Sequence, residues 1–265
     1  MPLTPVQIGN LKISRFIIGG NPFSGFSHQS KPRDNEMLSY HSTASIKKTL
    51  RHAESLGITT HISRGDQHVI RYLREYWNEG GKIDWICQTC PMVGSLQQIV
   101  DDGLNHCAKA IFFHGGMMDR RVRENADLDE LPRMVEKIKK AGLPVGCAGH
   151  NPKTFDWAQK NLDLDFYMCA YYALKWQPLP SGDYSESHDP AHRDAMVACI
   201  NTLRKPAIHY KVLAAGRIPP AEALTFVAQH LRPSDAVCVG ICLKDNPRSM
   251  EDNLRTLDAA IAASH

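Results

Sequence analysis

Short apolar segments alternate with amphipathic segments along almost the whole chain. The apolar segments predict β-strands over residues 15–20, 58–63, 83–88, 108–116, 143–149, 164–172, 207–217 (a strand with its loop) and 236–241. Apolar residues with helical spacing follow each of them, over residues 45–57, 68–81, 95–107, 128–142, 150–161, 190–205, 220–231 and 246–262. The strand segments lack the apolar–polar alternation of a sheet that has one solvent-exposed face, so we expect helices to cover the sheet that they form.

This repetition predicts an α/β fold, a (β/α)8 TIM barrel, formed by a single domain over residues 1–265. The leading segment 6–14 alternates in polarity and contains a Gly-Asn turn at Gly9 and Asn10. Alternation around such a turn is typical of a β-hairpin. We therefore expect an N-terminal hairpin that closes the bottom of the barrel.

Composition and charge exclude several classes of protein. The 265 residues carry 31 basic and 28 acidic side chains, and the basic ones are scattered, so a nucleic-acid surface is not expected. No apolar run is long enough to span a membrane, and the N-terminus lacks the pattern of a signal peptide. Cysteines lie inside apolar segments, which is typical of a reducing compartment. We expect a cytoplasmic protein with a small-molecule substrate, alone or as a homo-oligomer.

Several segments, in their order, resemble the aldo-keto reductase superfamily. "LKISRFIIGGN" is similar to its first strand, "VGCAGHNPKTFDWAQ" to its fifth, "DFYMCAYYAL" to the sixth with a tyrosine that stacks on nicotinamide, and "VGICLKDNPRSMEDNL" to the eighth strand and phosphate loop, including Asn253. The likeness runs over nearly the whole chain. It implies a barrel of this type, NADP as cofactor, and carbonyl reduction by a Tyr, Asp, Lys and His tetrad.

The chain departs from that tetrad. The family places Asp and Tyr after its second strand, where this chain reads "HISRGDQH" and offers only Asp66 nearby. Cys90 takes the place of the family's lysine, and His114 alone matches the fourth member. A reductase needs an acid to protonate the forming alkoxide, which contributes roughly a hundred- to ten-thousand-fold in rate. A divergent NADP-dependent reductase is therefore our alternative hypothesis rather than our first. In that alternative, the proton comes from Tyr171, Tyr172 or Asp66.

Polar residues follow the predicted strands where a barrel enzyme places its reacting groups, at the strands' carboxyl ends. The candidates for catalysis are Asp66, His114, His150, Tyr171 and Lys211. The candidates for binding a substrate or an anion are Asn21, Arg64, Gln88, Asn151, Arg217, Lys244 and Arg248.

Three kinds of chemistry fit the polar residues at the carboxyl ends of the predicted strands. His61, His114, His150 and His209 could hold a divalent metal, Zn or Mn, with Asp66, and the ion would polarise a carbonyl or activate water. Without a metal, His114, His150 and Lys211 could act as acids and bases, or Lys211 as a Schiff-base amine, because burial in an apolar strand lowers a lysine's pKa. His209, two residues earlier, is expected on the same face as Lys211.

In the third reading, Arg217 and the loop 243–248 with Lys244 and Arg248 bind an anion at a helix N-terminus. Structural roles compete with each reading: core hydrogen bonds for the histidines, an ion pair of Lys211 with Asp66, and a solvated basic loop.

The Cys-x-x-Cys spacing of Cys87 and Cys90 has no second pair with ligand spacing, so it predicts packing rather than a zinc or redox site. The sequence as a whole favours an enzyme that acts on a small carbonyl or carbohydrate-type substrate by acid/base chemistry, as an isomerase, lyase or hydrolase, with or without a metal. The alternatives are the reductase and a non-catalytic ligand-binding barrel.

Overall fold

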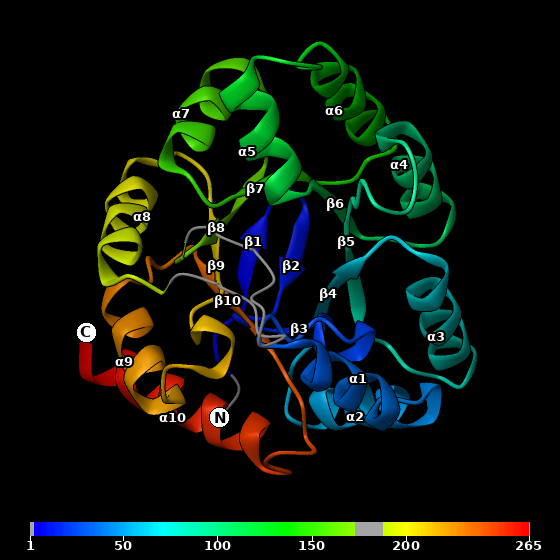
Figure 1. Cartoon of the computed structure of the whole chain (residues 1–265), viewed down its shortest axis with the longest axis vertical. Helices are drawn as coiled ribbons and strands as arrows, with labels where there is room; N and C mark the ends of the chain where they lie inside the picture. Colours follow the sequence, from blue (N-terminus) through cyan, green and yellow to red (C-terminus); the bar gives the residue numbers. More distant parts are fainter. Residues whose placement is uncertain (1–2, 173–187, 265) are drawn as a thin grey trace.

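The computed structural model describes residues 3–172 and 188–264, and within them eight parallel strands close into a barrel in the order β10-β3-β4-β5-β6-β7-β8-β9 (Figure 1). The strands are β3 (Phe16–Gly19), β4 (Thr60–Arg64), β5 (Asp84–Gln88), β6 (Ala110–Phe113), β7 (Val145–Gly149), β8 (Phe166–Ala170), β9 (Ala207–Tyr210) and β10 (Ala236–Gly240). The last strand pairs with the first, Val237 beside Phe16. The predicted (β/α)8 barrel is confirmed.

The predicted N-terminal hairpin is also present. Its strands β1 (Val6–Ile8) and β2 (Leu11–Ile13) pair antiparallel and cross the middle of the ring in Figure 1. Ile8 and Ile13 are buried in the core inside the barrel. At the turn, the Asn10 side chain donates to the Gly142 carbonyl oxygen, 2.9 Å away, in the loop that leads into β7. The hairpin therefore covers the amino-terminal end of the strands.

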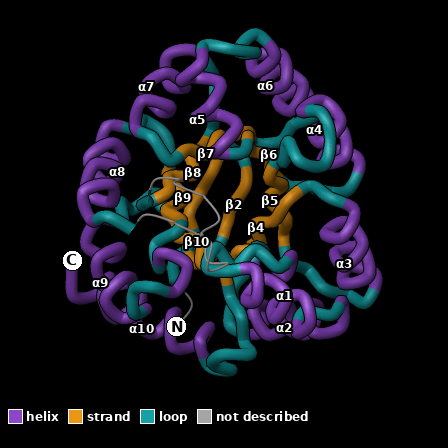
Figure 2. The backbone as a smooth tube through the Cα atoms, viewed as in Figure 1, coloured by secondary structure: helices purple, strands orange, loops and turns teal. Residues whose placement is uncertain are grey.

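A ring of helices surrounds the strands (Figure 2). The helices that the sequence predicted are α2 (Thr43–Ser55), α3 (Gln67–Asn78), α4 (Leu96–Asn105), α6 (Glu130–Lys140), α7 (Pro152–Asn161), α8 (Pro190–Thr202), α9 (Pro220–His230) and α10 (Ser249–Ser264). Their buried faces and the outer faces of the strands form the larger of two hydrophobic clusters. Within the described part of the chain, no helix has the length and apolar character to cross a membrane.

Two helices were not predicted. Helix α1 (Lys31–Tyr40) has no apolar stripe, although Ser30 caps it by accepting from the Arg33 N–H group. Helix α5 (Gly115–Glu124) begins with two glycines, which are poor helix formers, and so reads as the end of a strand. Consequently β6 ends at Phe113 and β9 at Tyr210, several residues before their predicted ends. Short 3₁₀ helices, η1 (Pro22–Ser24) and η2 (Ala214–Gly216), follow β3 and β9.

Candidate functional site

A cavity of about 550 Å³ opens at the carboxyl ends of the strands. Its inner part is lined by residues of five strands and the residue after β9: Ile62, Gln88, Phe112, Met168, Tyr210 and Lys211. It continues past the loops after β9 and β10 to the start of α10, where Ser249, Asp252 and Asn253 line it. Asn21 and Gln88 line the cavity, where the sequence analysis expected substrate-binding groups. The volume suits a small organic ligand.

A chain of hydrogen bonds leads from the cavity wall into the protein. Tyr210 Oη lies 3.2 Å from His150 Nε2, and His150 Nδ1 lies 2.8 Å from Asp119 Oδ2. Asp119 Oδ1 accepts from the Thr154 hydroxyl at 2.6 Å. We call these four residues the Tyr210 relay. Because the carboxylate accepts from Nδ1–H, Nε2 of a neutral His150 is left with the lone pair that faces the phenol.

The backbone around the relay explains why these side chains meet. His150 follows β7, and Asn151 begins α7 by accepting from the Lys153 N–H group. Asp119 lies on α5, which packs close because residue 115 is glycine. A Cβ atom there would lie 2.9 Å from His150 Cε1 and 3.0 Å from Tyr210 Oη. Asn151 is thus a helix cap, and Gly115 is a requirement of the site's geometry.

Lys211 lines the same cavity, directly after Tyr210. Successive residues of a strand normally point to opposite faces. Lys211 has a φ of 58°, in the left-handed region, so the chain turns there and both residues line the cavity. Such strain in a residue other than glycine is concentrated at functional sites in proteins.

His114 lies close to this group. It caps α5, with Nδ1 accepting from the Met117 N–H group at 3.3 Å, and its own N–H donates to Thr89 Oγ1 at 3.0 Å. Burial, and then the charge of His150, lower the pKa of His114 to about 4. The charges of Arg64 and Lys211 lower it further, whereas that of Asp119 opposes the shift. His114 is therefore a neutral imidazole near pH 7.

Three predicted site residues point the other way, into the layer between strands and helices. His61 is fully buried, with Nδ1 3.0 Å from the Ile18 carbonyl oxygen and Nε2 2.8 Å from Tyr72 Oη of α3. His209 Nδ1 lies 2.9 Å from Tyr171 Oη, and Tyr171 packs edge-on against Phe226 of α9. The structure therefore places these three side chains away from the cavity, and the catalytic role of Tyr171 and the metal-binding roles of His61 and His209 stay predictions.

The four histidines predicted as metal ligands do not share a centre. His150 lies against Tyr210 and His114 caps α5, whereas His61 and His209 lie against Tyr72 and Tyr171 in the layer between strands and helices. Across residues 3–172 and 188–264, no three or more His, Cys, Asp or Glu side chains are grouped as they would be to hold a metal ion.

Asp66 has a structural arrangement. One carboxylate oxygen accepts from the Val69 N–H group at 3.0 Å and so caps α3. The other lies 2.5 Å from Arg64, whose guanidinium stacks 4.3 Å above the Phe26 ring. Asp66 thus caps α3 and pairs with Arg64, rather than with Lys211 as the competing structural reading had it, and its catalytic role stays a prediction.

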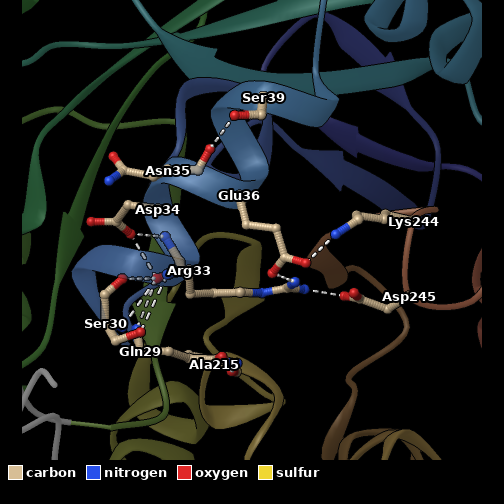
Figure 3. A network of polar contacts seen from close by, with 11 residues as sticks. Gln29, Ser30, Arg33, Asp34, Asn35, Glu36, Ser39, Ala215, Lys244 and Asp245 are labelled. Carbon is tan, nitrogen blue, oxygen red and sulfur yellow. Dashed lines mark hydrogen bonds and ion pairs between the residues drawn. The ribbon is translucent and has the colours of Figure 1, made fainter.

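Arg217, Lys244 and Arg248, the predicted anion-binding residues, each contact a different acceptor in the structure. Arg217 donates to the carbonyl oxygens of Ala214 and His28, at 3.2 and 3.0 Å. Arg248 is exposed and lies 3.9 Å from Asp252. Lys244 pairs with Glu36, which also pairs with Arg33 (Figure 3). These three cations are thus turned toward acceptors of the protein rather than toward one shared point.

Neutral polar side chains lie at the start of α10, at the outer end of the cavity. The Ser249 hydroxyl is buried and has no hydrogen-bond partner among the described residues. Asn253, which the family resemblance singled out, is buried and lines the cavity. Neutral donors, rather than convergent cations, therefore mark the outer end of the cavity.

The cysteines behave as predicted from their apolar setting. Cys87 and Cys90 are free and buried. Burial, helped by Asp102, raises the pKa of the Cys87 thiol, so this sulfur is an uncharged packing group.

Sequence reasoning missed Tyr210, Asp119 and Thr154. The visible signal for the relay was the glycine pair in "FFHGG", because glycine at such a position indicates close approach of neighbouring groups.

The barrel, its N-terminal hairpin and the cavity at the strand ends define a (β/α)8 barrel that resembles the aldo-keto reductases in fold. PA4992 of Pseudomonas aeruginosa, described as "the putative aldo-keto reductase", matches with a TM-score of 0.66 at 15% identity, over 97% of this chain and 96% of that one. Gox0644 in its apo form matches at 0.63 and 8% identity, over 100% and 95%.

Barrels with other names match as well. A phospho-2-dehydro-3-deoxyheptonate aldolase from Thermotoga maritima has a TM-score of 0.58 and 13% identity, over 98% of this chain and 73% of that one. No protein-family model and no curated protein sequence matches the chain. At these identities the likeness shows the fold, and the function has to be argued from the site.

Proposed function

We propose that this protein is an enzyme that acts on a small carbonyl or carbohydrate-type substrate by acid/base chemistry, with Tyr210 as the group that moves the proton. The observation that carries this proposal is the contact of Tyr210 Oη with His150 Nε2, 3.2 Å away, on the wall of the cavity. Perturbed and hydrogen-bonded titratable groups that converge on a cavity are the usual mark of an active site.

The relay allows Tyr210 to act first as a base. Its oxygen takes a proton from a substrate hydroxyl, or from the carbon beside a carbonyl, while its own proton passes to His150 Nε2. Asp119, 2.8 Å from Nδ1, stabilises the imidazolium that forms. In the reverse sense Tyr210 returns a proton to a different substrate atom. Lys211, in the same cavity, stabilises negative charge that develops on the substrate oxygen. These steps suit an isomerase or a lyase.

The charges around the cavity favour an uncharged substrate. Arg33 at its edge pairs with Asp245 and Glu36, and Asp252 also lines the wall. A polyhydroxy compound can use the hydroxyl and amide groups of this wall without needing unpaired cations.

Hydrogen exchange of candidate substrates tests the proposal. Aldoses, ketoses and small hydroxyketones are incubated with the protein in D₂O, and proton NMR follows the signal beside the carbonyl. We expect exchange with solvent or isomerisation for at least one compound, and its loss in Tyr210→Phe. Full activity of Tyr210→Phe would contradict the assignment, and no turnover in the whole panel would favour the non-catalytic ligand-binding barrel.

A second candidate function is NADP-dependent carbonyl reduction. The observation that favours it is the extension of the cavity to α10, where the buried Ser249 hydroxyl lacks a partner among the described residues. Asn246, Ser249 and Asn253 fit a phosphate-bearing group there and would hold NADP, which when bound would supply a hydride. Tyr210 would then protonate the alkoxide.

Titration with NADPH, followed by its fluorescence, separates the two candidates. Binding in the low micromolar range, weakened in Ser249→Ala, supports the reductase, whereas no binding at high micromolar concentration rules it out. Metal assistance stays a proposal for His114 and His150, and elemental analysis of the purified protein tests it.

A further inference from the structure

The segment between β3 and α2, residues 21–42, crosses the outer part of the cavity. Asn21, Phe26, Arg33 and Met37 of this segment line the cavity wall. Its helix α1 contributes little to the hydrophobic core: Met37 is buried, whereas Leu38 is 53% exposed. The next helix, α2, packs a full apolar stripe against the barrel. Hydrophobic burial therefore holds α1 far less firmly than its neighbour.

Polar contacts hold α1 in place instead. Arg33 pairs with Glu36 and with Asp245, and Lys244 pairs with Glu36, so four side chains join α1 to the loop after β10 (Figure 3). We call Arg33, Glu36, Lys244 and Asp245 the clasp. Asp245 and Lys244 are well exposed, and exposed ion pairs are screened by salt.

The other side of the segment is tied to the loop after β9. The Gln29 side chain donates to the Ala215 carbonyl oxygen at 2.5 Å, and Arg217 donates to the carbonyl oxygen of His28 at 3.0 Å. Phe23 anchors the start of the segment in the hydrophobic core, and Phe26 lies under Arg64 of β4. Beyond these two rings, the described attachments of α1 and the residues just before it are polar contacts to the loops after β9 and β10.

His41, directly after α1, destabilises the position in which this segment covers the cavity. It is 4% exposed, and neither of its ring nitrogens has a hydrogen-bond partner among the described residues. The rings of Phe23 and Tyr40 lie edge-on to it, with centroids 5.0 and 4.9 Å away. A buried polar group without partners favours any motion that returns it to water.

We propose that α1 is a lid over the cavity, held shut by the clasp, and that His41 makes its opening depend on pH. The inference names a regulation of the site described above and rests on the proposed function only in taking this cavity as the substrate site. In the open position the clasp is broken and His41 is hydrated, so substrate can reach Tyr210.

The direction of the pH effect follows from the two environments of His41. Burial, and then the Arg33 charge, lower the pKa of His41 from 6.5 to about 4, while Asp245 opposes the shift. In the open position the imidazole regains its ordinary pKa, so the open form binds a proton first. The closed position is fully favoured above the ordinary pKa, and opening gains about tenfold per pH unit as pH falls toward about 4.

Hydrogen bonds from Lys244 and Arg33 lower the pKa of Glu36, the carboxylate shared by both cations of the clasp. Arg33 and Asp245 are the charged groups that act on His41, and the rings of Phe23 and Tyr40 flank it. Protonation of Glu36 therefore does not account for opening at mildly acidic pH.

Amide hydrogen exchange of the full chain tests the lid without a substrate. Exchange of residues 31–40 is compared with that of residues 43–55, at low and roughly 0.5 M salt and from about pH 7 to about pH 5, after correction for intrinsic rates. We expect α1 to exchange at least tenfold faster than α2. High salt or Glu36→Gln should raise α1 exchange several-fold and leave α2 unchanged. Equal exchange of both helices under all conditions would overturn the lid.

His41→Phe and His41→Gln separate the pH device from the lid. We expect both variants to lose the extra opening at low pH while the salt effect remains, and α2 exchange in the same sample reports whether the variant is folded. An unchanged pH dependence in both folded variants would refute the role of His41. Tyr210→Phe should leave all these exchange rates as they are, so failure of the catalytic proposal and failure of the lid are told apart.

Discussion

Two sets of the same three side chains lie on opposite faces of β9. On the inner side, Tyr210, His150 and Asp119 form the relay whose phenol lines the cavity. On the outer side, Tyr171, His209 and Asp235 repeat the order, with 2.9 Å from Tyr171 Oη to His209 Nδ1 and 3.3 Å from His209 Nε2 to Asp235 Oδ2. The second set is sealed between the barrel and α9, so no substrate reaches it.

The two sets differ in the groups that donate hydrogen bonds to their carboxylate and so stabilise its negative charge. Burial alone would raise the pKa of Asp235, but hydrogen bonds from His209 and Arg232 hold it below its ordinary value. Its neighbour Ala207 donates a backbone N–H as well, at 2.8 Å. Asp119 is 14% exposed and accepts from the His150 ring, the His150 backbone N–H group and the Thr154 hydroxyl, with no arginine among these donors. Identical groups are therefore fully buried and structural on one side of the strand, and on the other side they line a cavity where we propose that they move protons.

The largest expected difference is in turnover. Tyr210→Phe removes the phenol that faces the cavity and should lower kcat/KM by roughly a hundred- to ten-thousand-fold. Tyr171→Phe removes the matching hydroxyl from the closed set and should change kcat/KM less than about threefold. Steady-state kinetics on the best substrate of the panel measures both. Similar losses in the two variants would mean that the inner set has no chemical role of its own.

The next expected difference is in the free energy of unfolding, where a change in the outer set should have a larger effect than a change in the inner set. Asp235→Asn leaves Arg232 and His209 buried beside a neutral amide and should cost about 3–5 kcal/mol in the free energy of unfolding. Asp119→Asn, at the wetter site, should cost about 1–2 kcal/mol. Urea denaturation followed by circular dichroism checks the pair. A larger loss for Asp119→Asn would show that the inner set, too, is chiefly structural.

The smallest effect concerns the geometry of the inner set. Gly115→Ala forces a methyl group against His150 and Tyr210, and a small displacement of reacting groups should lower kcat about tenfold. Gly94→Ala is the matched control, because its new methyl group meets only the movable end of the Gln98 side chain. Unfolding midpoints show whether either variant is folded, and wild-type kcat in Gly115→Ala would contradict the requirement for close packing.

Periodicity was sufficient to predict the barrel, because eight apolar strands with helices between them allow few other arrangements. It could not predict α1, whose anchoring is by ion pairs, or α5, whose two glycines conceal a helix that packs close to His150. Both missing helices carry residues that shape the cavity: Arg33 and Met37 on one, Asp119 on the other.

Within the site, the sequence identified His114, His150 and Lys211 as neighbours, but it assigned the wrong face to His209. A shift of one residue reverses every side chain of a strand, and β9 is followed by the left-handed residue Lys211, which no pattern of polarity reveals. His209 was therefore grouped with Lys211, and Tyr210 between them was passed over.

The hairpin at the amino-terminal end of the barrel also limits how small molecules can enter and leave the cavity. Val6, Ile8 and Ile13 of the hairpin pack against the interior side chains and close the amino-terminal end of the barrel. For the enzyme proposed above, substrate and product would therefore share the opening at the carboxyl ends of the strands. Added product should then act as a competitive inhibitor.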